Sequence, residues 1–443
     1  MVGGAALRWR PTAKSLVLFQ LVAVSISLFL ITEVGVPPTI RYAFDIVNIV
    51  LACLALSRRL REPGAERLTG VDWAFLVFFV YTLCSWTLSV AFGGAHPLDA
   101  VWQYRLLFRF YIFYYSCIEL VDASCIHSAF KALEVLFVIN LFLVAFQYVV
   151  LHKEGDYLGG IFGIEQGANG YMNIYLLIMV SYEMVKYLHG RLHLGTLAFY
   201  FAGALGIAVL AELKFMYVEL VVAIVTAMLM KRPTLRSFRF AMAALLAMVL
   251  GILALKAVLP ESYAILFEGK GVDGYLSASW TNGWEIGRTT AIDMINERFF
   301  SNYGIYAQYH LGFGVEWLNR LFGFGFGSCT ASVFNTPAFA TAYESTNYGA
   351  FEFADRYLDS GAVGLGLYVS VFVMMFIAAV KGLTSFSGDR KMLCHLVAVL
   401  VPLVLMNIWY GSLRIEICYL LFFVLALPRA VGRRPGIPSE VTR

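Results

Sequence analysis

The sequence predicts an all-α, polytopic membrane protein with about twelve transmembrane helices and one large, partly helical loop between spans 9 and 10. Hydrophobic residues make up 60% of the 443 positions and charged residues only 14%, which exceeds the apolar share of an ordinary soluble domain. The apolar residues form long uninterrupted runs, and lysine and arginine gather in alternate connecting segments. Together these observations predict a chain that crosses a bilayer many times.

A spanning helix needs about 20 mainly apolar residues. Runs of that kind lie near residues 15–32, 40–57, 72–93, 101–120, 128–151, 170–188, 195–212, 214–230, 240–258, 361–380, 392–410 and 412–428. Glu212 and Lys214 interrupt one long apolar stretch, which predicts a tight hairpin tip between the seventh and eighth spans. Because further spans follow the first run, that run is interpreted as an uncleaved span rather than a signal peptide.

The distribution of positive charge predicts the orientation. With the N-terminus inside, 21 of the 33 lysines and arginines fall on the inner side, as the positive-inside rule requires. Both termini are therefore expected in the cytoplasm. The net charge of +4 provides no basic field for nucleic acid, and the seven scattered cysteines show neither a disulfide framework nor a zinc spacing.

The chain divides into spans 1–9 (residues 1–258), a large loop (259–360), and spans 10–12 with a cytoplasmic tail (361–443). The loop is too polar to cross a bilayer, and its 22 aromatic residues are too many for a disordered linker. Residues 281–302 have the pattern of an amphipathic helix, and the glycine-rich stretch 321–328 predicts a flexible turn. No internal repeat is visible, which counts against a transporter built from duplicated halves.

Ionisable residues inside spans are costly and mark functional positions by default. Arg105 and Arg109 lie four residues apart on one face of the fourth span. Two guanidinium groups placed this way could clamp a pyrophosphate, since arginine binds phosphate oxygens bidentately. The alternative is that they reach the interface or pair with Asp99 or Asp45.

Other charged residues have simpler alternatives. Lys214 could form a local ion pair with Glu212, and Arg414 could anchor the last span at the interface. Arg41 is expected to pair with Asp45, one helical turn away.

In the large loop, Arg288 opens the amphipathic helix, whereas Arg356 follows Asp355 and is expected to be solvated. His310 lies among tyrosines, where a histidine is more often structural.

This pattern resembles the O-antigen ligase and O-antigen polymerase superfamily, whose members have about twelve spans, inside termini and a long periplasmic loop between spans 9 and 10. The resemblance covers residues 70 to 425. It rests on the order of several short motifs: Phe162-Gly163 with Gly167-Ala-Asn169-Gly170, Glu212-Leu-Lys214, Gly287-Arg288, Gly323-Phe-Gly325-Phe-Gly327, and Leu358-Asp-Ser-Gly361-Ala-Val-Gly364-Leu.

The resemblance implies a metal-independent glycosyltransferase of the bacterial inner membrane. Such an enzyme transfers an oligosaccharide from undecaprenyl pyrophosphate to a sugar hydroxyl on another lipid-linked glycan, without a cofactor. A flippase and a chain-length regulator are further expected partners, beside the membrane lipid. The cationic residues expected at the pyrophosphate are Arg105, Arg109, Lys214, Arg288 and Arg414.

The ligases carry a His-Asn pair shortly before the loop ends, and this sequence has no histidine there. The difference favours a polymerase and leaves Glu344 and Glu352 as the nearest candidate general bases, with His310 as a third. The alternatives are an O-antigen ligase acting on a lipid A-core acceptor, a lipid-linked oligosaccharide flippase or other transporter, and a non-catalytic assembly subunit.

Overall fold

The computed structural model describes residues 12–61, 68–91, 95–231, 234–258, 260–268, 316–343 and 348–432. Within these ranges the regular structure is entirely helical. The long helices are α1 (Ala13–Thr32), α2 (Arg41–Arg61), α3 (Gly70–Ala91), α4 (Pro97–Leu120), α5 (Ala123–Val149), α6 (Ala168–Leu188), α7 (Leu194–Leu210), α8 (Met216–Leu229), α9 (Leu235–Val258), α16 (Glu352–Ser385), α17 (Gly388–Tyr410) and α18 (Cys418–Gly432). The short ones are η1 (Pro38–Ile40), η2 (Gly155–Tyr157), η3 (Gly160–Phe162), α10 (Pro260–Tyr263), η4 (Ala264–Glu268), α14 (Glu316–Phe322), α15 (Ala338–Tyr343) and η7 (Tyr348–Ala350).

Each apolar run predicted as a span falls on one of the long helices. In the part of the chain that the structure describes, seven helices are long and apolar enough to cross a membrane: α1, α2 with η1, α3, α5, α9, α16 and α17. Helices α7, α8 and α18 are apolar but shorter. The chain is therefore a multi-pass membrane protein.

The predicted hairpin tip between the seventh and eighth runs is confirmed. Helix α7 ends at Leu210 and α8 begins at Met216. Glu212 between them has a φ of +51°, a left-handed conformation that is uncommon outside tight turns.

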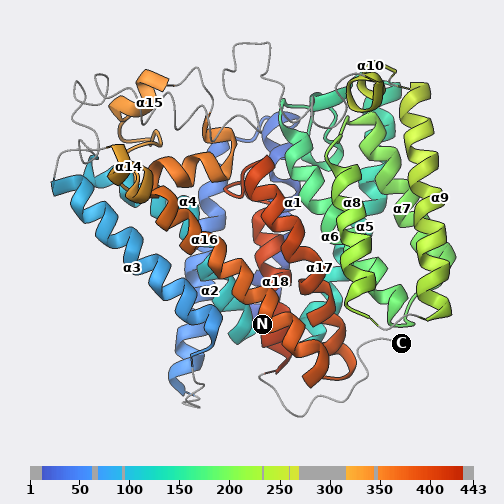
Figure 1. Ribbon diagram of the computed structural model, residues 1–443, viewed down its shortest axis with the longest axis horizontal. Helices are drawn as coiled ribbons and strands as arrows, with labels where there is room; N and C mark the ends of the chain where they lie inside the picture. The colour runs from blue at the N-terminus through green and yellow to red at the C-terminus, as the bar shows by residue number, and fades with distance from the viewer. Residues whose placement is uncertain are drawn as a thin grey trace, which may run out of the picture.

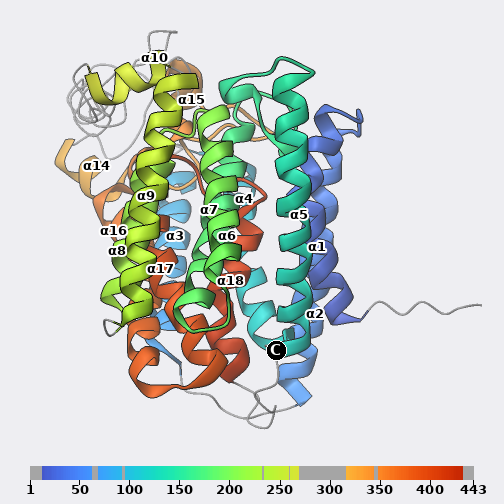
Figure 2. The same cartoon turned by 90° about the vertical axis from the view of Figure 1, so that its right-hand side faces the viewer.

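The helices form a bundle in which α10, α14 and α15 lie at one end, and the C-terminal turn of α18 lies at the other (Figure 1). We call the first of these the loop end. Helix α16 crosses the bundle obliquely (Figure 1) and packs against α3 and α17, whereas α4 packs between α2 and α18. Helices α7 and α9 pack together at the edge of the bundle (Figure 2).

Burial separates the inner helices from the outer ones. Helix α18 is apolar and buried on nearly all sides, as expected for a helix enclosed by others. Helix α9 instead exposes large side chains, including Leu245, Leu246 and Leu253. A continuous exposed apolar face of this kind suits contact with lipid tails.

The tenth predicted span differs from expectation at its start. It was expected to begin at residue 361 after a polar loop, but α16 begins nine residues earlier, at Glu352. Gly361 breaks the helix with φ +64° and ψ −171°, a conformation essentially restricted to glycine. A side chain there would also meet the backbone, because an added Cβ would lie 2.3 Å from the carbonyl carbon of Leu321. The segment 352–360 is thus a buried helical arm.

Candidate functional site

Helix α4 carries the two arginines that the sequence singled out. Arg105 Nη2 lies 2.6 Å from Asp45 Oδ2 on α2. Its guanidinium also lies 4.5 Å from the ring centroid of Trp102 and 4.7 Å from that of Tyr42, within the range of a cation–π contact. Of the predicted alternatives, pairing with Asp45 is confirmed. Asp99 instead accepts hydrogen bonds from Ser332 and Asn335.

Arg109 lies one turn deeper and is only 4% exposed. Its Nη2 donates a hydrogen bond of 2.5 Å to the carbonyl oxygen of Arg414. Its Nη1 lies 3.6 Å from Glu416 Oε1 and 3.9 Å from Asp45 Oδ1. Arg109 therefore ties α4 to the segment that precedes α18.

The expected pairing of Arg41 with Asp45 is wrong. Asp45 pairs with Arg105, and Arg41 Nε lies 4.0 Å from Glu416 Oε1 instead. Residues one turn apart on a helix can pair, but here the arginine of the neighbouring helix offers Asp45 a shorter contact.

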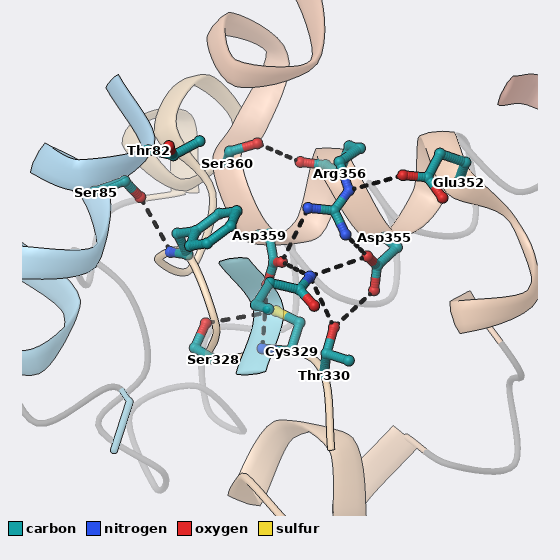
Figure 3. Close-up of polar contacts among 12 residues, drawn as sticks. Thr82, Ser85, Ser328, Cys329, Thr330, Glu352, Asp355, Arg356, Asp359 and Ser360 are labelled. Carbon is teal, nitrogen blue, oxygen red and sulfur yellow. Dashed lines mark hydrogen bonds and ion pairs between the residues drawn. The ribbon is translucent and has the colours of Figure 1, made fainter. Parts of the chain in front are cut away.

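A second group of charges surrounds Arg356 on the arm of α16 (Figure 3). Its side chain is 1% exposed, so the expectation of a solvated residue is wrong. Its Nε lies 3.2 Å from Glu352 Oε1, its Nη1 lies 3.7 Å from Asp359 Oδ2, and its Nη2 contacts Asp355. Three carboxylates of one helical arm thus hold one guanidinium group. Glu352 and Asp359 lie four residues before and three residues after Arg356, on the same helix face, and Asp355 is its neighbour in sequence.

Polar groups from two other segments complete this arrangement (Figure 3). Gln103 Nε2 on α4 donates to Asp359 Oδ2 at 2.7 Å and lies 3.4 Å from Asp355 Oδ2. Thr330 Oγ1 donates to Asp355 Oδ1 at 3.0 Å, and the backbone N–H of Cys329 donates to Asp359 Oδ1 at 3.3 Å. Burial raises the pKa of the Cys329 thiol well above its usual range. The thiol therefore stays protonated and is a poor nucleophile.

Arg414 joins the two groups of charges. Its Nη1 lies 3.0 Å from Asp355 Oδ2, its Nε lies 3.6 Å from Glu352 Oε2, and its Nη2 donates to the carbonyl of Gly349 at 2.7 Å. Glu352 also accepts from the N–H of Leu413 at 3.2 Å. Glu352 is fully buried, so in this conformation it braces the two arginines and is closed off from the surroundings.

We call the whole set the arginine–carboxylate cluster. Its members are Arg41, Arg105, Arg109, Arg356 and Arg414 with Asp45, Glu352, Asp355, Asp359 and Glu416. Five guanidinium groups thus face five carboxylates. The sequence predicted a cationic cavity, whereas the part of it that the structure describes is balanced in formal charge.

The predicted flexible turn at 321–328 is firmly packed. Phe324 and Phe326 are buried, and the N–H of Phe324 donates to the carbonyl of Leu358 at 2.8 Å. Gly323 has a φ of +75°, and an added Cβ would lie 2.5 Å from the backbone of Asp359. The turn therefore needs glycine in order to seat Cys329 and Thr330 against the carboxylates.

Lys214 lies at the tip between α7 and α8, where its Nζ is 3.2 Å from Glu212 Oε2, so the local ion pair is confirmed. The adjacent Phe215 stacks on Tyr410 with ring centroids 4.0 Å apart. Because Tyr410 ends α17, just before the Arg414 segment, the tip lies at the same end of the bundle as the cluster.

Arg288, His310 and Glu344, together with the amphipathic helix expected at 281–302, lie outside the described residues.

Sequence reasoning missed Gln103, Asp355 and Asp359. The signal that could have found them is spacing: Glu352, Asp355 and Asp359 recur at the interval of one helix face. The segment was instead interpreted as the end of a loop.

Comparison with known proteins adds no family assignment. No protein-family model matches the chain, and no curated protein sequence matches it.

Proposed function

We propose that this protein is a polysaccharide polymerase of the bacterial inner membrane, with about twelve spans, both termini in the cytoplasm and residues 259–360 in the periplasm. In the proposed reaction, an acceptor hydroxyl oxygen forms a bond to the anomeric carbon of the donor glycan. The bond from that carbon to the pyrophosphate oxygen breaks, and the lipid pyrophosphate leaves with the electron pair. The hydroxyl proton passes to a protein base.

The observation that carries the proposal is that Arg105, Arg109 and Arg414 meet at the loop end of the bundle. Each was assigned to the pyrophosphate from sequence alone, yet Arg109 and Arg414 are 305 residues apart and joined by a hydrogen bond. Arginines preorganised in a low-dielectric site stabilise negative charge that develops on a leaving group. The resemblance to the O-antigen polymerase superfamily supplies the donor and acceptor classes.

The balanced charge of the cluster defines how a pyrophosphate would bind. Arg105 is 22% exposed and its partner Asp45 is 17% exposed, so this pair is more accessible than Arg356. A pyrophosphate would have to compete with the Asp45 carboxylate for the Arg105 guanidinium, whose planar fork binds either anion bidentately. Arg414 is also partly exposed, at 12%, and Lys214 and Arg288 are further proposed ligands.

The general base remains with Glu344 or His310 in this proposal, because Glu352 is already occupied by two arginines. Both candidates belong to the proposed periplasmic segment. A carboxylate or histidine within hydrogen-bond reach of the acceptor hydroxyl would supply the usual contribution of general base catalysis.

The test uses cells from which the gene has been deleted. Lipid-linked glycans extracted from these cells should carry single repeat units, and re-expression of the wild-type protein should restore a ladder of longer glycans. A ladder that persists without the gene would contradict a polymerase. Single units that accumulate only on the cytoplasmic leaflet of the deletion strain would instead indicate a flippase, and a full ladder that fails to reach lipid A-core would indicate a ligase.

The orientation can be tested separately with an impermeant thiol reagent. A cysteine introduced as Val333→Cys, at a position that is 60% exposed, should be labelled in cells whose outer membrane is permeable to the reagent. Ser387→Cys, at the α16–α17 connection, should be labelled only after the inner membrane is opened. The reverse pattern would contradict the proposed orientation.

A further inference from the structure

A groove runs between α7 and α9 at the edge of the bundle, away from the arginine–carboxylate cluster. It has a volume of about 470 Å³ and is lined along its length by apolar side chains, from Leu194 at the start of α7 to Val209 near its end. The opposite wall is α9, from Phe240 to Ala254. Leu246 and Leu250 on this wall are more than half exposed, so the groove faces the surroundings of the bundle.

The length of the groove identifies the kind of chain that fits it. Leu194 and Val209 are 15 residues apart, which corresponds to about 22 Å along an α-helix. The hydrocarbon core of a bilayer is about 30 Å thick, so one leaflet supplies about 15 Å. An acyl chain of a phospholipid is confined to its own leaflet, whereas a polyprenyl chain is long enough to follow the groove past the midplane.

The groove ends beside positive charge at the loop end of the bundle. Lys214 lies in the turn that follows α7, and Lys256 lies two residues beyond Ala254 on α9. Lys256 Nζ pairs with Glu268 at 3.2 Å, with both side chains more than half exposed. An exposed pair of this kind contributes little to stability, so its ammonium group can turn to a phosphate at small cost.

We propose that the α7–α9 groove binds the polyprenyl tail of the lipid carrier, which enters the groove beside Lys256 and Lys214, the latter also a proposed ligand of the pyrophosphate. This inference rests on the proposed function for the identity of the carrier. It adds a site for the apolar part of the substrate, on helices that contribute nothing to the described part of the cluster.

Substitution of Gly206 by a larger residue would fill part of the groove. Gly206 lies on the groove wall, and an added Cβ would meet nothing within 4 Å. The Cβ of Gly206→Leu therefore meets no neighbour that the structure describes, and the longer side chain adds volume at the groove wall. Gly366 on α16 also has nothing within 4 Å and lies outside the groove, so Gly366→Leu is the matched control. Ala202→Leu, one turn from Gly206 on the same wall, is a second filling variant.

The experiment measures how much undecaprenyl phosphate, a C55 probe, stays bound to the full-length protein purified in lipid nanodiscs. Gly206→Leu and Ala202→Leu should each lower retention by at least about tenfold, equivalent to about 1.4 kcal/mol. Gly366→Leu should retain the probe as the wild type does. The wild type should retain farnesyl phosphate, a C15 probe that occupies only the part of the groove within one leaflet, more weakly than the C55 probe.

Three results would overturn the inference. Equal retention of the C55 probe by both filling variants would show that the tail lies elsewhere. Equal retention of the C15 and C55 probes by the wild type would indicate a chain confined to one leaflet. A change from dimer to monomer in the filling variants would make the groove an interface between two copies of the chain. Because retention is measured without glycan transfer, a correct groove and a wrong polymerase assignment would remain distinguishable.

Discussion

Arg429 and Arg356 both hold carboxylates within the bundle, at opposite ends of it. Arg429 binds Asp72 bidentately, with Nη1–Oδ1 at 2.7 Å and Nη2–Oδ2 at 3.1 Å. Asp72 also accepts hydrogen bonds from Tyr115 and Thr69. One cation therefore meets one anion in nearly ideal geometry, which is the arrangement expected of a structural clamp.

The hydrogen bonds of the arginine–carboxylate cluster at the loop end are less complete than those of the Arg429–Asp72 pair. Among the described residues, Nε and Nη1 of both Arg109 and Arg356 make no hydrogen bond, and neither does Glu352 Oε1. Arg109 Nη1, and Nε and Nη1 of Arg356, instead lie 3.2 to 3.9 Å from carboxylate oxygens. Buried donors without partners are costly, so they are rarely retained for stability alone. The comparison shows that, among the described residues, Arg109 and Arg356 each have buried polar atoms without a hydrogen bond, whereas Arg429 has none.

The largest expected effect comes from removing the central cation. Arg356→Ala would leave Glu352, Asp355 and Asp359 buried without it, and an uncompensated buried charge costs about 3–5 kcal/mol. Arg429→Ala removes an arginine that is 24% exposed, and the loss should be smaller. Thermal unfolding of both variants in detergent tests the comparison. Equal losses would show that the two ends are equivalent.

Gly361→Ala should have the next largest effect. It places a side chain in a backbone conformation that costs about 1–3 kcal/mol and against the backbone of Leu321, where overpacking typically costs about 1–3 kcal/mol. The control is Gly366→Ala on the same helix, where an added Cβ meets open space. A Gly361→Ala variant as stable as its control would mean that the break in α16 does not position the cluster.

The variant Glu352→Gln distinguishes a structural role of Glu352 from a role as the general base. The variant keeps the side-chain oxygen that accepts from Leu413 but removes the charge that faces Arg356 and Arg414, and a loss of about 1–3 kcal/mol is expected. Glycan chain growth should fall together with the melting temperature. A drop of roughly 100-fold in turnover at unchanged stability would instead restore Glu352 as the general base.

The sequence predicted the helices well because apolar length is a local property. The ranges for α2 and α17 agree with the structure to within a few residues, and the tip at Glu212 was placed correctly. The sequence also singled out Arg105 and Arg109 as charged residues inside an apolar run. Such residues can be recognised without knowing their ion-pair partners.

The ion-pair partners of these arginines were harder to predict, because they depend on how the helices pack together. Asp45 was assigned to Arg41 on its own helix, but α4 packs against α2 and brings Arg105 closer. Arg356 was expected in water because Asp355 is its neighbour in sequence, and the packing of 323–330 over α16 buries both. The polar composition of 352–360 concealed a helix whose carboxylates are paired with Arg356 in the same segment and with Arg414 from another one.

The central claim is that Arg105 belongs to a pyrophosphate site and not to a structural clamp. The most direct measurement compares glycan ladders from the deletion strain expressing Arg105→Ala, Arg105→Lys or Arg59→Ala at matched protein levels. Arg59 is the control, because its exposed side chain pairs with Glu119 at 3.1 Å near the opposite end of α4. Arg59→Ala should give a normal ladder and Arg105→Lys a shortened one, since a point charge cannot reproduce bidentate binding. Arg105→Ala should give single repeat units, as removal of one such donor typically costs about 10²- to 10³-fold in rate. A normal ladder from folded Arg105→Ala would contradict the claim.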